Sequence, residues 1–280
     1  MRAPLAALAG IGASAAVVFS TSILPLPLLL RVGHWLPSGD PRLVVLTVQA
    51  LGLALVLVVL KVPICSLLRG WPPRRGIMAG GWLTLGTFLF SLLVSMTIVS
   101  TSGLDDQSRT ANALASWERE FPSTGLAGHF AFYAVFGPIF EELLYRALVL
   151  GYLLRLLPPW LGLAVSTLLF AAGHPSWFFS GLSGVAYGLL YLRYRNLWLC
   201  VLTHSAHNLV SSAGATLLVA YVHDSRFSTP MNLLPLQLTW TLVALACFAM
   251  FLRHVFAKLE GGPSVLLLGP RASVTPGTTG

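Results

Sequence analysis

Long apolar stretches, separated by one or a few charged residues, dominate the chain. Seven stretches contain no Asp, Glu, Lys or Arg, namely 3–30, 43–60, 76–104, 121–140, 156–192, 196–223 and 227–252. Each is close to or longer than the roughly 20 residues that an α-helix needs to cross a bilayer. The pattern therefore predicts a membrane protein built from helices.

One of these seven stretches is divided by a proline, so eight transmembrane helices are predicted. The stretch 156–192 is too long for one crossing, and Gly173-His174-Pro175 in its middle predicts a turn, because proline removes a backbone donor. The fourth helix is expected to continue to about Leu157, where Pro158-Pro159 ends it. The predicted fold class is an all-α, polytopic membrane helical bundle.

The stretches and the polar segments divide the chain into four parts. Residues 1–104 are expected to hold three transmembrane helices, and residues 126–257 the helices that carry the chemistry. The polar segment 105–125 is expected to lie on the membrane interface as a short helix, and the tail 258–280 to be disordered. The first apolar run is too long for a secretory signal, so we expect an uncleaved span.

Composition excludes a soluble enzyme. Charged residues make up 9% of the chain and hydrophobic residues 56%, whereas roughly 25% of residues are charged in a soluble protein. The formal net charge is +8, but the basic residues are scattered between apolar runs and form no stripe, which argues against nucleic-acid binding. The topology with most Lys and Arg on the cytoplasmic side has both termini in the cytoplasm.

Ionisable residues in the middle of an apolar helix are expected to have an ion-pair partner or a functional role, since inserting each one at the bilayer centre costs roughly 2.5–3.5 kcal/mol of free energy. Glu142 and Arg146 are four residues apart on one helix face, so they are predicted to pair. Glu141 points about 100° away from Glu142 and has no such local partner. A carboxylate in this position suits a general acid or base. Alternatively, all three residues form one buried network that braces the bundle.

Two further helices carry polar residues at helical spacing. Phe170 and His174 are four residues apart at the end of the fifth helix, and His204 and Asn208 share a face of a later one. His207 lies about 60° round that helix from His204. A structural or interfacial histidine and hydrogen bonds between helices are the alternative explanations.

Taken together, these residues form three motifs in a fixed order. They are Glu141-Glu142-x-x-x-Arg146, Phe170-x-x-x-His174 and His204-x-x-x-Asn208. This arrangement resembles the CPBP (ABI) family of intramembrane proteases, which includes CAAX-prenyl endopeptidases and bacteriocin-processing relatives. The resemblance covers about residues 130–215. The spacing from His174 to His204 is shorter than we expect for the prenyl-substrate branch, so the substrate class stays open.

The resemblance implies peptide hydrolysis by an activated water. Glu141, His174, His204 and Asn208 would be catalytic, and Glu142 and Arg146 would support their helix. Glu141, His174 and His204 could equally hold Zn²⁺ with an open position for water, as in a metalloprotease, so the expected cofactor is either none or zinc.

The resemblance also implies partners and a location. The substrate would be a membrane-associated or lipidated protein or peptide within the lipid bilayer, with no nucleic acid involved. The protein would be an integral, multi-pass membrane protein, in the plasma (inner) membrane of a bacterium.

Two other classes of function remain open. In a proton-coupled transporter, the Glu and His side chains would relay protons. In a non-catalytic immunity or scaffold protein, the same motifs would serve packing. Uptake by vesicles would identify a transporter, and a Glu141→Gln variant that keeps its phenotype would identify a scaffold.

Overall fold

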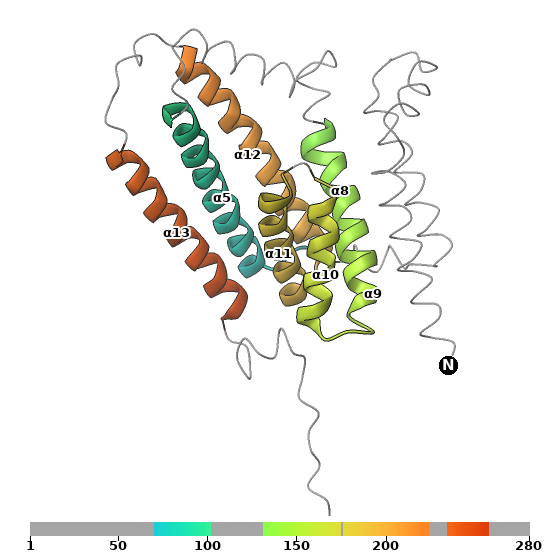
Figure 1. Cartoon of the computed structure of the whole chain (residues 1–280). Helices are drawn as coiled ribbons and strands as arrows, with labels where there is room; N and C mark the ends of the chain where they lie inside the picture. Colours follow the sequence, from blue (N-terminus) through green and yellow to red (C-terminus); the bar gives the residue numbers. More distant parts are fainter. Residues whose placement is uncertain (1–69, 102–130, 175, 224–233, 258–280) are drawn as a thin grey trace, which may run out of the picture. The chain divides into compact units, whose positions relative to one another are not determined.

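A computed structural model describes residues 70–101, 131–174, 176–223 and 234–257. All secondary structure in these ranges is helical and none is β-strand, which confirms the all-α class (Figure 1). The first two predicted helices, the uncleaved first span, the interfacial segment 105–125 and the tail 258–280 lie outside the described residues. The count of eight helices and the four-part division therefore stay predictions.

Five long helices follow the predicted apolar stretches. They are α5 (Arg74–Thr101), α10 (Pro159–Ala172), α11 (Trp177–Tyr194), α12 (Leu197–His223) and α13 (Leu234–Phe256). The long stretch 156–192 is split between α10 and α11 at residues 173–176, as the Gly-His-Pro sequence predicts. Pro159 occupies the first position of α10, where its missing N–H removes no helical hydrogen bond.

The helix that carries the first motif differs in detail from its prediction. It consists of η1 (Ala131–Phe136), α8 (Gly137–Glu142), η2 (Leu143–Leu150) and α9 (Gly151–Leu153). The η segments are π-helical, so each N–H bonds to the carbonyl five residues earlier, and the last helical residue is Leu153 rather than Leu157. The sequence did not predict the π-helical turns, because a nearly uniform run of apolar residues contains no periodicity to distinguish them.

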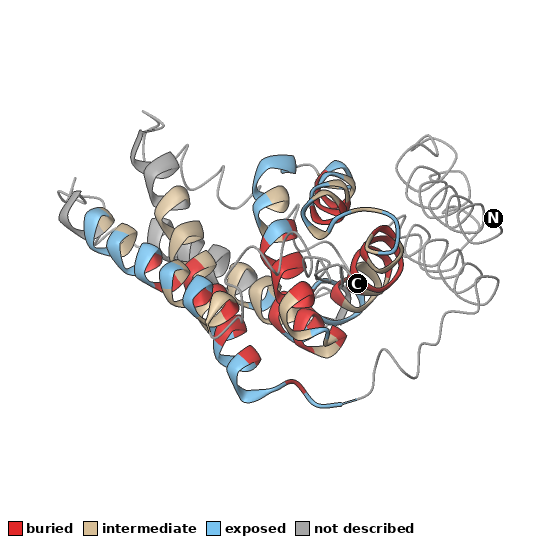
Figure 2. Ribbon diagram, turned by 90° about the horizontal axis from the view of Figure 1, so that it is seen from below, coloured by how far each residue is buried: buried red, intermediate tan, exposed pale blue. Residues whose placement is uncertain are grey.

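Two described helices are long and apolar enough to cross a membrane. These segments are Arg74–Val94 and Gln237–Phe256, with mean hydropathies of 1.8 and 1.6, and α10 is a shorter apolar helix. Large apolar side chains such as Leu168, Trp177 and Leu242 are exposed. Exposed positions occur along several of the described helices (Figure 2). An apolar exterior of this kind fits contact with lipid.

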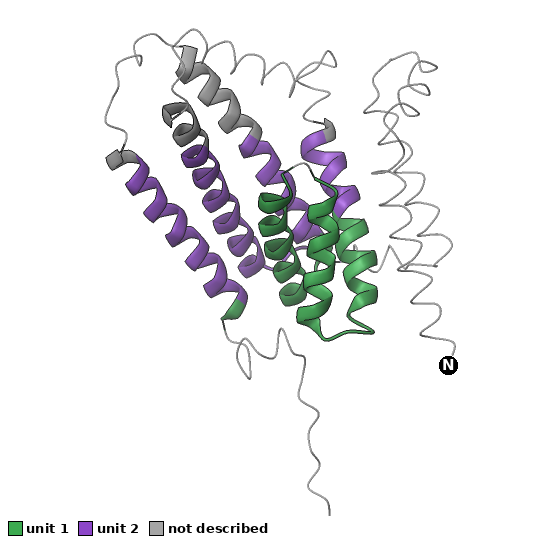
Figure 3. Cartoon of the chain, viewed as in Figure 1, with its two compact units in different colours: residues 1–69, 142–197, 256–280 green, residues 70–141, 198–255 purple. Residues whose placement is uncertain are grey.

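The chain divides into two compact units (Figure 3). The described part of unit 1 comprises residues 142–174, 176–197 and 256–257, and that of unit 2 comprises 70–101, 131–141, 198–223 and 234–255. The division falls within α8, between Glu141 and Glu142.

Close contact between α10 and α11 forms the centre of unit 1. A Cβ atom added at Gly184 would lie 3.3 Å from Thr167 Cγ2, and one added at Gly188 would overlap Leu163 Cδ1. Small residues four apart allow helix backbones to approach closely in a membrane. Ser166 Oγ also donates a hydrogen bond of 3.0 Å to the Tyr145 carbonyl, which joins α10 to η2.

In unit 2, α5 lies between α12 and α13 (Figure 1). A Cβ added at Gly76 would lie 2.7 Å from Leu199 of α12, and one added at Gly80 would overlap Thr203 Oγ1 of the same helix. On another side of α5, a Cβ at Gly86 would lie 3.0 Å from Cys247 of α13. The glycines therefore set the spacing between α5 and the helix that carries His204.

Candidate active site

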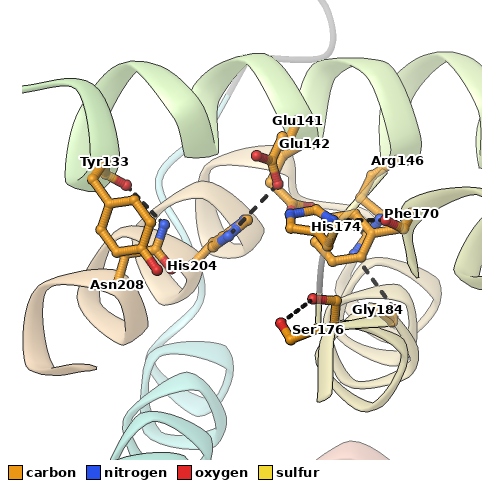
Figure 4. Close-up of polar contacts among 11 residues, drawn as sticks. Tyr133, Glu141, Glu142, Arg146, Phe170, His174, Ser176, Gly184, His204 and Asn208 are labelled. Atoms are coloured by element: carbon orange, nitrogen blue, oxygen red, sulfur yellow. Dashed lines mark hydrogen bonds and ion pairs between the residues drawn. The ribbon is translucent and has the colours of Figure 1, made fainter. Parts of the chain in front are cut away.

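Glu141 and His204 meet in unit 2 (Figure 4). Glu141 is the penultimate residue of α8, and His204 lies in the second turn of α12. Glu141 Oε2 and His204 Nε2 are 3.8 Å apart, and the side chains are 26% and 6% exposed. This distance exceeds that of a direct hydrogen bond, but one water molecule bonded at about 2.8 Å to each atom would fit. The gap between the two atoms is therefore wide enough for one small polar group.

Asn208 lies one turn after His204 on α12. Its Nδ2 atom donates a hydrogen bond of 2.7 Å to the backbone carbonyl of Tyr133 in η1 (Figure 4). The side chains of Glu141, His204 and Asn208 thus belong to one cluster within unit 2. Sequence analysis assigned no role to Tyr133, because a backbone carbonyl carries no signal of its own.

Glu142 and Arg146 form the predicted pair within unit 1. Arg146 Nε and Glu142 Oε2 are 3.2 Å apart, and both residues are fully buried, at 0% exposure. The Arg146 Nη2 atom also donates to the Gly184 carbonyl of α11, at 3.4 Å. A buried charge is tolerated when it is paired and hydrogen-bonded.

Two aromatic rings complete the surroundings of the Arg146 guanidinium. Its central carbon lies 4.9 Å from the centroid of the Phe170 ring and 5.8 Å from that of Tyr187. Such cation–π contacts favour a guanidinium in a desolvated site. The sequence motifs related Phe170 only to His174, and none of the contacts of Arg146 with Phe170, Tyr187 or Gly184 was predicted.

Phe170 also holds His174 in unit 1. The two rings are 4.6 Å apart, and the His174 Nδ1 atom lies 2.7 Å from the Phe170 carbonyl (Figure 4). Because a carbonyl oxygen only accepts hydrogen bonds, Nδ1 carries the proton in this contact. In the neutral imidazole, Nε2 then has the lone pair and can accept a proton or a hydrogen bond.

The six predicted site residues are thus divided between the two units. Glu141, His204 and Asn208 are in unit 2, and Glu142, Arg146 and His174 are in unit 1. The cooperation of His174 with Glu141 and His204 stays a prediction. His207 follows His204 by three residues and is half-buried, and it has no role in the predicted site.

The zinc set of Glu141, His174 and His204 stays a prediction, because His174 belongs to the other unit. As the described residues are arranged, no group of three or more His, Cys, Asp or Glu side chains could hold a metal ion. The Glu141 and His204 pair supplies two donor atoms, whereas a catalytic zinc site needs three protein ligands.

The comparison with protein families agrees with the three motifs. Residues 123–210 match the family model described as type II CAAX prenyl endopeptidase Rce1-like. The match contains all three motifs and confirms the resemblance to the CPBP and CAAX protease family. No curated protein and no solved structure matches the chain significantly.

Proposed function

We propose that the protein is an intramembrane endopeptidase, because residues 123–210 match the model of a family of integral-membrane CAAX proteases. Its substrate would be a membrane-associated or lipidated protein or peptide. The observation that supports the proposal most is the contact between Glu141 and His204 at 3.8 Å, with Asn208 one turn further along the same helix.

The first step is the attack of water on the scissile carbonyl carbon. The Glu141 carboxylate acts as general base and takes a proton as the water oxygen forms the new C–O bond. The role expected of His174 from the sequence motifs is to accept a hydrogen bond from the same water at Nε2, because Nδ1 carries the proton in its contact with the Phe170 carbonyl. The carbonyl π electrons move to the oxygen, which becomes an oxyanion.

Two donors on α12 then stabilise the oxyanion. Asn208 carries two N–H bonds on Nδ2, of which the Tyr133 carbonyl uses one. The second N–H and the Nε2–H of His204 donate to the oxyanion, as in other acyl-transfer sites. The protonated Glu141 passes its proton to the amide nitrogen as the C–N bond breaks. The products are a carboxylic acid and an amine, which exchange a proton to become a carboxylate and an ammonium group.

Glu142 and Arg146 take no part in the proton transfers. Their ion pair, together with the Gly184 carbonyl and the Phe170 ring, holds the helix that carries Glu141. A fixed carboxylate is important because misplacement by about 1 Å can reduce the rate by roughly 10²-fold.

The substrate can be found by comparing new N-termini of membrane proteins in cells that contain the wild type or Glu141→Gln. The Glu118→Gln variant is a matched control, since it makes the same chemical change outside the three motifs. We expect a set of cleavages that wild type and Glu118→Gln produce and Glu141→Gln does not. The same cleavages in all three strains would contradict the proposal, and coupled proton uptake by vesicles would favour a transporter.

A further inference from the structure

Tyr145 contacts the residues that hold His174 in unit 1. The Phe170 carbonyl accepts from His174 Nδ1 at 2.7 Å and from the Gly173 N–H at 3.3 Å. The Tyr145 ring meets the Phe170 ring edge-on, with the centroids 5.1 Å apart and the planes at 77°. Tyr145 is only 5% exposed, and its own carbonyl accepts the hydrogen bond from Ser166. Tyr145 is therefore a fixed, buried neighbour of the residues around His174.

Gly173, the residue before His174, is the second point of contact. Its φ and ψ are −77° and −2°, which other residues also adopt in turns, so the backbone conformation does not require glycine. A Cβ atom added there would lie 3.1 Å from the Tyr145 hydroxyl oxygen, closer than ordinary van der Waals contact. The next nearest atom, the Phe170 carbonyl oxygen, would lie at an ordinary 3.5 Å. The hydroxyl group of Tyr145 therefore occupies the space that a side chain at position 173 would need.

We infer that Tyr145 is a positioning residue for His174. Its ring packs on Phe170, whose carbonyl and ring both contact His174, and its hydroxyl group packs against Gly173. These contacts limit the movement of the turn that carries the imidazole. The consequence for catalysis rests on the proposed function, in which His174 accepts a hydrogen bond from the attacking water.

The contact at position 173 predicts a substitution whose effect depends on the Tyr145 hydroxyl. Gly173→Ala should lower the melting temperature by about 2–6 °C in the wild type, because the added methyl group overpacks this contact. In the Tyr145→Phe background it should leave the melting temperature unchanged or raise it by up to about 2 °C, since alanine has less freedom than glycine in the unfolded chain. Equal shifts in both backgrounds would overturn the inference.

Turnover distinguishes positioning from packing. We expect kcat to fall about 10-fold in Gly173→Ala and about 3-fold in Tyr145→Phe, with KM changed by less than about 2-fold, because His174 acts on the water in the transition state. The double variant should recover the kcat of Tyr145→Phe alone. The substrate is one found from the N-terminal comparison. Unchanged kcat in both single variants, with coupled melting, would make Tyr145 a packing residue and overturn the inference.

Gly181→Ala is the matched control. A Cβ atom there would lie 3.7 Å from Ala171 Cβ, an ordinary contact, so its effect should be the same with and without the Tyr145 hydroxyl. If Gly173→Ala does not accumulate alone, accumulation of the double variant shows the rescue, and its kcat is compared with that of Tyr145→Phe. Failure of both to accumulate would mean that the hydroxyl is not what excludes a side chain at position 173, which would overturn the inference.

Nitrogen NMR of the imidazoles tests the inference without a substrate, with His174→Ala identifying the signal. Wild-type His174 should carry its proton on Nδ1, as its contact with the Phe170 carbonyl requires. Gly173→Ala should show a mixture of tautomers, and the double variant should show the wild-type tautomer. The same mixture in both variants would overturn the inference.

These measurements separate the inference from the proposed function. If no proteolysis is found in the wild type but melting and NMR show the rescue, the proposed function fails while the positioning of His174 by Tyr145 holds. If proteolysis is found and no measurement shows a rescue, the proposed function holds and the inference fails.

Discussion

Two adjacent carboxylates in this chain have different surroundings. Glu142 is fully buried against Arg146, whereas the Glu141 side chain is 26% exposed and faces His204. This difference supports a bracing role for Glu142 and a chemical role for Glu141. The two roles predict different consequences for the same Glu-to-Gln substitution.

Glu142→Gln should destabilise the protein by about 3–5 kcal/mol, because it leaves the Arg146 guanidinium buried without its carboxylate. The double change Glu142→Gln and Arg146→Met removes both charges and should recover much of that loss. Thermal melting in detergent measures both effects. A double variant that melts no higher than Glu142→Gln would show that the ion pair is not the source of the stability.

Substitution of the predicted catalytic histidines should reduce cleavage more than substitution of Asn208. His174→Ala and His204→Ala should abolish cleavage, since each removes a group that handles the water or the oxyanion. Asn208→Ala should keep a measurable rate, because loss of one oxyanion donor reduces kcat by roughly 10²–10³. Turnover of a substrate found from the N-terminal comparison decides between these outcomes. Near wild-type turnover by either histidine variant would remove that residue from the mechanism.

At the scale of the elements, the spacing between α5 and α12 controls the position of His204. Gly80 packs on Thr203, the residue before His204, while a Cβ added at the neighbouring Gly81 would meet no atom within 4 Å. These two glycines therefore offer a matched pair of substitutions on one helix.

Gly80→Ala should lower stability by about 1–3 kcal/mol, because the added methyl group overpacks the contact with Thr203. It should also reduce turnover by moving the start of α12. Gly81→Ala should be neutral or stabilise by up to about 1 kcal/mol, since alanine favours a helix over glycine. Melting and turnover are measured for both variants. Equal effects would mean that the contact between the two helices does not position the site.

The turn between α10 and α11 and the start of α10 were predictable from the sequence, whereas the end and the local geometry of the helix that carries Glu141 were not. Proline and glycine mark the turn between α10 and α11 and the start of α10, because proline lacks an N–H whatever its surroundings. The π-helical segments η1 and η2 were missed, since their residues are almost all apolar and show no periodicity.

Contacts within the candidate site were predictable where the two residues are close in the sequence. Glu142 and Arg146 pair at a spacing of four residues, and so do the rings of Phe170 and His174. The spacing of residues in the sequence did not predict the hydrogen bond from Arg146 to Gly184, which are 38 residues apart, or the one from Asn208 to Tyr133, which are 75 residues apart. Both contacts end on a backbone carbonyl, which any residue type provides.

At the scale of the whole molecule, the account predicts a protease that works without a bound metal ion. Dialysis against a chelator should leave both turnover and melting temperature unchanged, because the Glu141 carboxylate carries out the proton transfers and the two imidazoles only hydrogen-bond to the water and the oxyanion. A mock-dialysed sample is the control. Loss of activity that added Zn²⁺ restores would mean that a metal ligand set forms during the reaction, and the roles of Glu141 and His204 would have to be rewritten.

The most direct test of the central claim is to measure turnover and thermal melting on the same purified sample of Glu141→Gln. Glutamine keeps the shape of the side chain but cannot take the proton from water, and the variant no longer buries a charge. The account predicts no detectable cleavage, with a melting temperature equal to or slightly above that of the wild type. Cleavage near the wild-type rate, or melting as low as Glu142→Gln, would contradict the assignment of Glu141 as the general base.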